Sequence, residues 1–188
     1  MTHSTVRRRD LLAGLAGAAV AVAGCSRAGD VSSETAGAEA VTVETIEAPG
    51  SEAGTVTIPD TERITFLEFF ATTCSTCAAQ MERLREAHER LGEEVLFVSV
   101  TSEPVGQTIS RADLAAWWDD HGGAWPVGLD DGLSLARQYD ATTVPTALVL
   151  TPGDTVAWRE TGRVDTSTIV GAVRDARSCE SERLVRLS

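Results

Sequence analysis

The chain changes character at about residue 40, and from there its apolar and polar positions follow patterns that predict strands and helices. Three dense runs of β-forming residues are predicted to be buried strands, at residues 64–70, 95–100 and 146–150. Shorter strands are predicted at residues 41–45, 56–58, 125–129 and 155–160. Helical spacing or capping residues predict four helices, at residues 75–91, 110–121, 133–139 and 165–177.

Strands and helices alternate through most of this region, and the last two strands flank a Thr-Pro-Gly-Asp turn at residues 151–154. Such an order predicts an α/β fold in which a central mixed sheet is flanked by helices on both faces. The turn makes one part of that sheet antiparallel. A single domain at residues 41–178 accounts for all of these elements, and residues 179–188 are predicted to form a C-terminal tail.

Residues 1–24 are predicted to be an export signal. Three arginines at positions 7–9 precede a short, weakly apolar run that ends in small residues, and it is too short for a span of about 20 apolar residues. The arginine pair followed by Asp-Leu-Leu resembles a twin-arginine (Tat) signal, and Val-Ala-Gly-Cys at residues 22–25 resembles a lipobox. Cys25 is therefore the predicted lipidation site, which would anchor the protein on the outer, extracytoplasmic face of the membrane. The alternative is an uncleaved signal anchor.

Residues 25–40 are small, polar and acidic, and are predicted to be a flexible tether. The whole chain of 188 residues has 28 acidic and 16 basic side chains, a formal charge of −12, and no lysine. Such a surface repels nucleic acid, so that class of partner is excluded. Dense carboxylates need salt screening, and the composition therefore predicts a halophilic protein.

Cys74 and Cys77 stand at the point where a buried strand gives way to a helix. A helix N-terminus favours a thiolate, so Cys74 is the predicted attacking sulfur and Cys77, one turn on, the resolving thiol. A zinc site would need two further ligands, and the spacing of His88 and His121 does not supply them, so no metal is predicted. A purely structural disulfide would add little stability across so short a loop, which favours redox chemistry.

The segment FFATTCSTC followed by AAQM resembles the active-site segment of the thioredoxin superfamily, and the membrane-tethered TlpA/ResA-like branch is the most similar. Two further segments carry this resemblance: residues 139–146, similar to the family's tyrosine-to-cis-proline segment, and the turn at 151–154 with Gly162 after it. The resemblance covers residues 41–177. With the predicted N-terminus and composition, it implies a haloarchaeal-type lipoprotein with a thioredoxin-like fold.

The resemblance also implies roles for individual residues. Pro145 would follow a cis peptide bond, and the loop of Thr143, Val144 and Pro145 would contact the substrate, with the Val144 backbone pairing with a substrate strand. The alternative is a trans proline that opens a strand. Glu68 stands where thioredoxins keep a buried acid, and could take the proton of Cys77; the alternative is an edge position facing solvent. No cofactor is implied beyond the Cys74–Cys77 disulfide.

Three departures from the family pattern concern the surroundings of the thiolate. Thr73 replaces the usual Trp, Ser75-Thr76 replaces a dipeptide that usually ends in Pro, and Gln80 stands where ResA-like proteins often carry Glu. None of these changes removes the dithiol. His88, Trp117, Trp118 and Trp125 are predicted to be packing residues, and Cys179 is predicted to be non-catalytic.

The function predicted from these features is that of an extracytoplasmic, membrane-tethered thiol–disulfide oxidoreductase. Its partners would be exported cysteine-containing proteins and a membrane electron donor or acceptor. The resemblance connects such a protein with the maturation of cytochrome c or of copper sites. The protein is expected to be a monomer. Three alternatives stay open. A Sco-like metallochaperone would need C-x-x-x-C and a distal His, whereas this chain has C-x-x-C and no His beyond His121. A peroxiredoxin would need a proline partner for Thr72, which this chain lacks. A redox-inactive binding module would not need two thiols at this place.

Overall fold

The computed structural model of the protein describes residues 40–187. The predicted signal at residues 1–24, the lipidation site Cys25 and all but the last residue of the tether lie outside the described residues. Within the described part, no helix is both long and apolar enough to cross a membrane.

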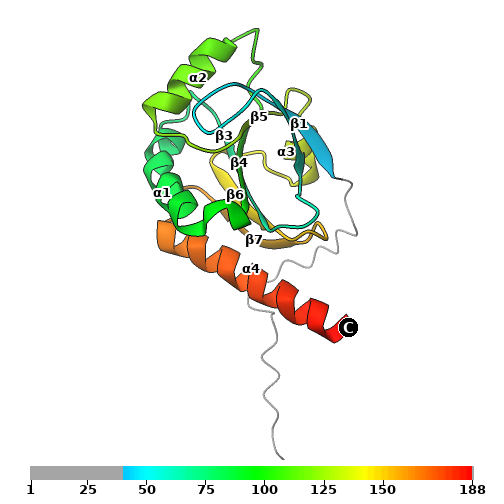
Figure 1. Ribbon diagram of the computed structural model, residues 1–188. Coiled ribbons are helices and arrows are strands. Elements are labelled where there is room, and N and C mark those ends of the chain that lie inside the picture. The colour runs from blue at the N-terminus through cyan, green and yellow to red at the C-terminus, as the bar shows by residue number, and fades with distance from the viewer. Residues whose placement is uncertain (1–39, 188) are drawn as a thin grey trace, which may run out of the picture.

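Seven strands and four α-helices make up the domain (Figure 1). The strands are β1 (Val41–Thr45), β2 (Gly54–Ile58), β3 (Thr65–Phe70), β4 (Leu96–Thr101), β5 (Val127–Leu129), β6 (Thr146–Leu150) and β7 (Val156–Thr161). The helices are α1 (Ser75–Leu91), α2 (Arg111–Asp120), α3 (Ser134–Gln138) and α4 (Thr166–Leu187), with a short 3₁₀ helix, η1 (Gly92–Glu94), after α1.

The strands form one mixed sheet in the order β2-β1-β5-β4-β3-β6-β7. The three central strands β3, β4 and β5 run parallel, while β6 and β7 pair antiparallel on one side and β1 and β2 on the other. Parallel neighbours bring their carboxyl ends to the same edge of the sheet, so the loops that follow β3 and β4 lie side by side.

Two apolar cores cover the two faces of the sheet, and β3 shows how its residues divide between them. Phe66 and Phe70 face the core shared with α1, α2 and α4, whereas Leu67 and Phe69 face the core shared with α3. Figure 1 shows α1 and α2 on the side of the sheet away from α3. The predicted α/β fold, a central mixed sheet with helices on both faces, is confirmed.

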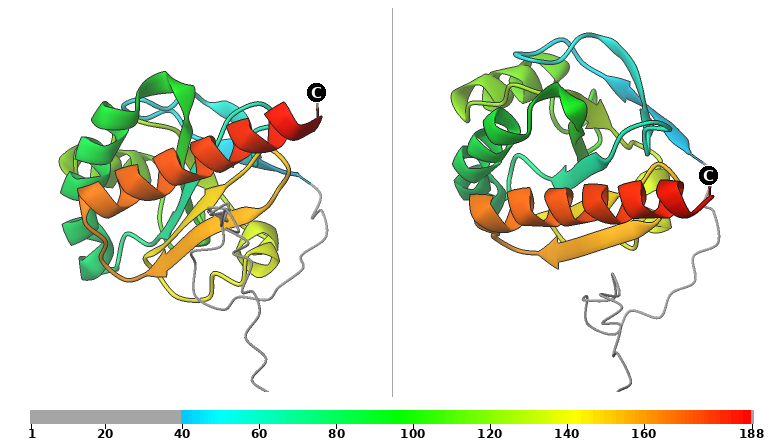
Figure 2. Two further views of the ribbon diagram at one scale, coloured as in Figure 1. Left: turned by 90° about the horizontal axis from the view of Figure 1, so that it is seen from below. Right: turned by 60° about the horizontal axis from the view of Figure 1, so that its bottom comes forward.

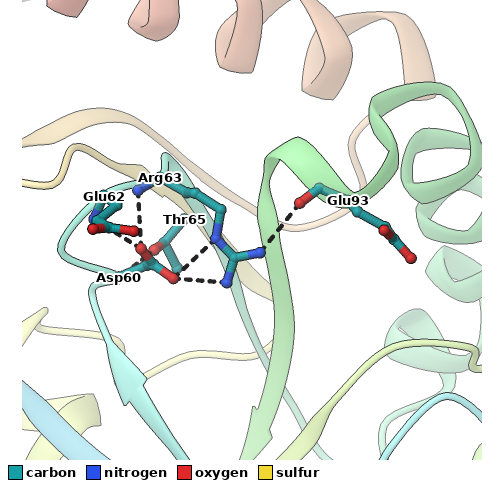
Figure 3. Close-up of polar contacts among 5 residues, drawn as sticks. All are labelled: Asp60, Glu62, Arg63, Thr65 and Glu93. Atoms are coloured by element: carbon teal, nitrogen blue, oxygen red, sulfur yellow. Dashed lines mark hydrogen bonds and ion pairs between the residues drawn. The ribbon is translucent and has the colours of Figure 1, made fainter.

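The loop between β2 and β3 is tied down by Asp60, whose carboxylate caps the turn (Figure 3). Its Oδ1 accepts hydrogen bonds from the backbone N–H groups of Glu62 (2.8 Å) and Arg63 (2.9 Å), and its Oδ2 pairs with the Arg63 guanidinium at 2.7 Å. Arg63 also donates to the carbonyl oxygen of Glu93 in η1 at 3.1 Å. These bonds fix the point at which β3 begins, and β3 leads directly to the cysteines.

The final helix is longer than predicted. The prediction that it ends at Arg177 was wrong, because α4 continues to Leu187 through residues expected to form a tail. Among the α4 side chains that the structure describes, the last buried one is Ala176, and the apolar pattern used to place the helix end stops near it. The residues that follow include no glycine or proline that would end a helix, and Figure 2 shows α4 continuing past the sheet to the C-terminus.

Candidate functional site

Cys74 and Cys77 are joined in a disulfide at the start of α1, with their Cα atoms 5.2 Å apart. Cys74 is the N-cap of this helix, and its Sγ accepts a hydrogen bond from the backbone N–H of Cys77 at 3.1 Å. Cys74 is half-buried, whereas Cys77 is 0% exposed. A protein substrate can therefore reach only the first of the two sulfurs.

The electrostatic setting of Cys74 favours its ionised form. The unpaired N–H groups at the start of a 17-residue helix carry a partial positive charge, and the first turn of α1 contains no acidic residue. One of these N–H groups already points at the Cys74 sulfur. A reduced Cys74 would therefore be stabilised as a thiolate, which is the nucleophilic form of cysteine.

The loop before β6 packs against the disulfide. The peptide bond between Val144 and Pro145 is cis, as the resemblance implied, and the carbonyl oxygen of Val144 lies 3.8 Å from Cys74 Sγ. Thr146 donates from Oγ1 to the carbonyl oxygen of Thr143 at 2.7 Å, and Gly162 donates from its backbone N–H to Pro145 at 2.8 Å. The structure thus brings Val144 next to Cys74, and its neighbour Thr143 is exposed beside it.

An open cavity of about 490 Å³ lies beside this loop, on the α3 side of the sheet. Its walls come from the end of β3, the loop after β4, α3 and the Val144 loop, and they include Phe69, Ala71, Leu133, Ala141 and Val144. Leu133 is 41% exposed, which is high for a large apolar side chain. The cavity offers an apolar surface to a chain that approaches Cys74.

Glu68 is buried on the α1 side of the sheet, and only 1% of it is exposed. It pairs in register with Ser99 on β4 and Ala147 on β6, and Ser99 donates from Oγ to Glu68 Oε2 at 3.0 Å. Burial raises the pKa of Glu68 to about 8, against a smaller lowering by the hydrogen bond from Ser99. The carboxyl group therefore changes its protonation near neutral pH, as an acid–base group must.

Gln80 and His88 both act as packing residues of α1. Both atoms of the Gln80 amide are used by Val164: Nε2 donates to its carbonyl oxygen at 3.0 Å, and Oε1 accepts from its N–H at 3.1 Å. His88 is half-buried against Phe97 and Trp125, and burial lowers its pKa. Trp118 and Trp125 are fully buried, and Trp117 stacks on Phe70, so the prediction of packing roles for these residues is confirmed.

Sequence reasoning missed Glu103, which contacts the loop that carries Cys74. Its carboxylate accepts hydrogen bonds from the backbone N–H of Thr72 at 2.7 Å and from the Thr72 hydroxyl at 2.9 Å. The contact follows from the fold, since Thr72 and Glu103 each stand two residues beyond the end of neighbouring parallel strands. No motif marks Glu103, so only the pairing of β3 with β4 reveals it.

Comparison with known proteins places this site in a family. The model of the AhpC/TSA family matches residues 39–171. Among solved structures, StoA from Bacillus subtilis has 18% sequence identity and a TM-score of 0.61, and the match covers 73% of this chain and 98% of that one. Etrx1, an exposed lipoprotein thioredoxin of Streptococcus pneumoniae, has 20% identity and a TM-score of 0.57, with 70% and 98% covered.

A secreted disulfide oxidoreductase of Mycobacterium tuberculosis is also similar, with 13% identity, a TM-score of 0.57, and 71% and 94% of the two chains covered. At these identities the likeness establishes a thioredoxin-like fold. A comparison with curated proteins gave no match.

Proposed function

The chain belongs to the AhpC/TSA family, and from this premise we propose that it exchanges electrons between its Cys74–Cys77 pair and the cysteines of exported proteins. It is a thiol–disulfide oxidoreductase of the thioredoxin type. The observation that carries this function is the unequal burial of two bonded sulfurs, with Cys74 accessible at a helix N-terminus and Cys77 enclosed beneath it.

In the reducing direction, the Cys74 thiolate attacks one sulfur of a substrate disulfide. A mixed disulfide forms between Cys74 and the substrate, and the other substrate sulfur leaves as a thiolate and takes up a proton. Cys77, as a thiolate, then attacks Cys74 Sγ, which forms the Cys74–Cys77 disulfide and releases the second substrate sulfur as a thiolate, which takes up a proton from solvent. Two electrons and two protons pass to the substrate, and the oxidising direction is the same sequence reversed.

Cys77 must lose its proton inside the protein before the second step. Glu68 is the buried acid of β3 on the face that packs against α1, and its raised pKa suits it to accept a proton near neutral pH. The side chain of Gln80 is held by the Val164 backbone and offers no such group. We assign to Glu68 the removal of the Cys77 proton.

The substrate segment is held by the Val144 loop. The Val144 carbonyl stands next to Cys74, so backbone pairing at Thr143 and Val144 would place a substrate cysteine against the attacking sulfur. The apolar cavity beside Val144 would then take a neighbouring apolar side chain of the substrate. Both features support a polypeptide as the substrate, since a small thiol would use neither.

The site of action is proposed to be the outer face of the cell membrane. The residues that carry this proposal are the twin-arginine-like start and the lipobox that ends in Cys25. A lipid on Cys25 and the tether after it would leave the domain free to contact exported proteins. It could also contact a membrane protein whose dithiol reduces the Cys74–Cys77 disulfide again. Apocytochrome c and copper-site proteins are the substrate classes that we propose.

Reduction of insulin by the purified protein in high salt tests the activity. We expect turnover with a thiol reductant by the wild type, and none by Cys74→Ser. Consumption of hydrogen peroxide at a rate above that of disulfide reduction would instead assign the protein to the peroxide reductases. The site of action is tested separately, since Cys25→Ala should move the protein from the membrane fraction to the soluble exported fraction. Retention of that variant in the membrane would contradict the lipid anchor.

A further inference from the structure

Glu103 joins the two loops that meet at the edge of the sheet beside the disulfide. Its two carboxylate oxygens accept separate hydrogen bonds from Thr72, one from the backbone N–H at 2.7 Å and one from the hydroxyl at 2.9 Å. Thr101, the last residue of β4, donates a third bond from Oγ1 to Glu103 Oε2 at 3.2 Å, and its Oγ1 also accepts from the Glu103 N–H at 3.2 Å. The carboxylate is therefore held from both strands.

Thr72 belongs to the turn that delivers Cys74. This turn is closed by a hydrogen bond from the N–H of Cys74 to the carbonyl oxygen of Ala71 at 3.1 Å, so Thr72 lies inside it. Between β3 and α1 the chain runs only from Ala71 to Cys74. A bond that holds Thr72 therefore limits the movement of the Cys74 sulfur relative to Val144 and to the substrate cavity, which Glu103 itself helps to line.

We propose that Glu103 is a positioning residue for the thiol–disulfide exchange, which it serves by clamping Thr72 and so fixing Cys74 in its attacking position. The inference rests on the proposed oxidoreductase function and assigns to it a residue outside the cysteine pair, the buried acid and the Val144 loop. Hydrogen bonds to a carboxylate are shorter and stronger than neutral ones, which suits a clamp at a partly exposed edge. Among the ion pairs of residues 40–187, none includes Glu103.

Three variants separate the geometry of the clamp from its charge. Glu103→Ala removes both acceptors and leaves the Thr72 N–H without its partner. Glu103→Gln keeps an oxygen for that N–H and offers its own N–H to the Thr72 hydroxyl, so it removes the charge and keeps the clamp. Thr72→Val removes only the hydroxyl bond. Glu47→Gln is the matched control, because its carboxylate also accepts a backbone N–H, from Ala53 at 3.3 Å, but lies in the β1–β2 loop.

The rate at which reduced Cys74 attacks a chromogenic aromatic disulfide is measured for each protein, together with the melting temperature. We expect Glu103→Ala to slow the attack about tenfold, Glu103→Gln and Glu47→Gln to stay within about threefold of the wild type, and Thr72→Val to fall between. The double variant Glu103→Ala/Thr72→Val should be no slower than Glu103→Ala alone, because both changes break the same clamp.

An unchanged rate in Glu103→Ala would overturn the proposal, and so would an equal loss in Glu103→Gln, since charge rather than position would then be the cause. Should Glu103→Ala fail to fold, Thr72→Val decides: a rate at least about threefold slower supports the clamp, and a wild-type rate contradicts it. This chemical rate does not depend on the natural substrate. The wild-type protein could therefore attack the small disulfide and yet fail to reduce insulin. That result would contradict the proposed function, while the Glu103 and Thr72 variants would still decide whether the clamp exists.

Discussion

Ser99 donates a hydrogen bond from Oγ to Oε2 of Glu68 at 3.0 Å, and the two residues are direct partners on the parallel strands β3 and β4. An ionised Glu68 can only accept, so the Ser99 hydroxyl proton points to it. The Ser99 oxygen in turn accepts a hydrogen bond from the indole Nε1–H of Trp125 at 2.9 Å. Ser99 thereby stabilises the ionised form of a carboxylate whose burial disfavours it.

Removal of the Ser99 hydroxyl should raise the pKa of Glu68 further. In Ser99→Ala, burial acts without the opposing hydrogen bond, and the pH of half-maximal disulfide reduction should move up by about one unit. The measurement is a pH–rate profile in high salt. Ser102→Ala is the control, because its hydroxyl contacts Asp130 instead, at 3.4 Å, and its profile should match the wild type. A profile unmoved by Ser99→Ala would show that Glu68 does not set the pH dependence.

The stability of the protein should fall as the pH rises through the titration of Glu68. The unfolded chain ionises this group near its ordinary pKa of 4.5, whereas the folded protein keeps it protonated up to about 8. The stabilisation is therefore complete below pH 4.5 and is lost as the pH rises from there through about 8. The amide in Glu68→Gln cannot ionise. The unfolding free energy of this variant minus that of the wild type should therefore increase by roughly 2–4 kcal/mol between pH 5 and pH 9.

Urea unfolding at several pH values, with the salt concentration fixed, measures this difference. Glu47→Gln removes an exposed carboxylate and should give a curve parallel to that of the wild type. Parallel curves for Glu68→Gln and the wild type would mean that the carboxyl group is not buried in the folded protein.

Gln80 should resist replacement by the acid found at this place in ResA-like proteins. Gln80→Glu turns the donor that faces the Val164 carbonyl oxygen into an acceptor, so an ionised carboxylate would meet that oxygen. We expect a loss of roughly 1–3 kcal/mol in unfolding free energy at pH 7, and recovery at acidic pH where the protonated acid donates again. Thermal melting at both pH values measures this loss of stability, and Gln107→Glu at an exposed position is the control. A Gln80→Glu protein as stable as the wild type at pH 7 would contradict the prediction.

The sequence was enough to predict every strand and the start of every α-helix of the described residues to within a few residues. Buried strands such as β3 carry dense β-forming residues, and α1 begins at a cysteine that the strand delivers to a helix start. The end of α4 was not predictable in the same way, because none of the described side chains beyond Ala176 is buried, although the helix continues to Leu187.

The residues of the site also differ in how far the sequence predicts them. Cys74, Cys77 and Pro145 belong to local motifs, and the family resemblance carried by those motifs predicts that they lie together. The face on which Glu68 lies depends on strand register, and sequence alternation left open whether it is buried. The contacts of Glu103 with Thr72 and of Ser99 with Trp125 join residues 31 and 26 positions apart, and only the pairing of strands brings them together.

The central claim is that Cys74 attacks and Cys77 resolves. It is tested most directly by incubating Cys77→Ser and Cys74→Ser, each reduced, with a disulfide-bonded protein such as insulin, and identifying trapped adducts by mass spectrometry. The account predicts a stable mixed disulfide at Cys74 in Cys77→Ser, and no adduct at Cys77 in Cys74→Ser, because the Cys77 sulfur is enclosed. Adducts of equal yield on both cysteines, or on Cys77 alone, would contradict it.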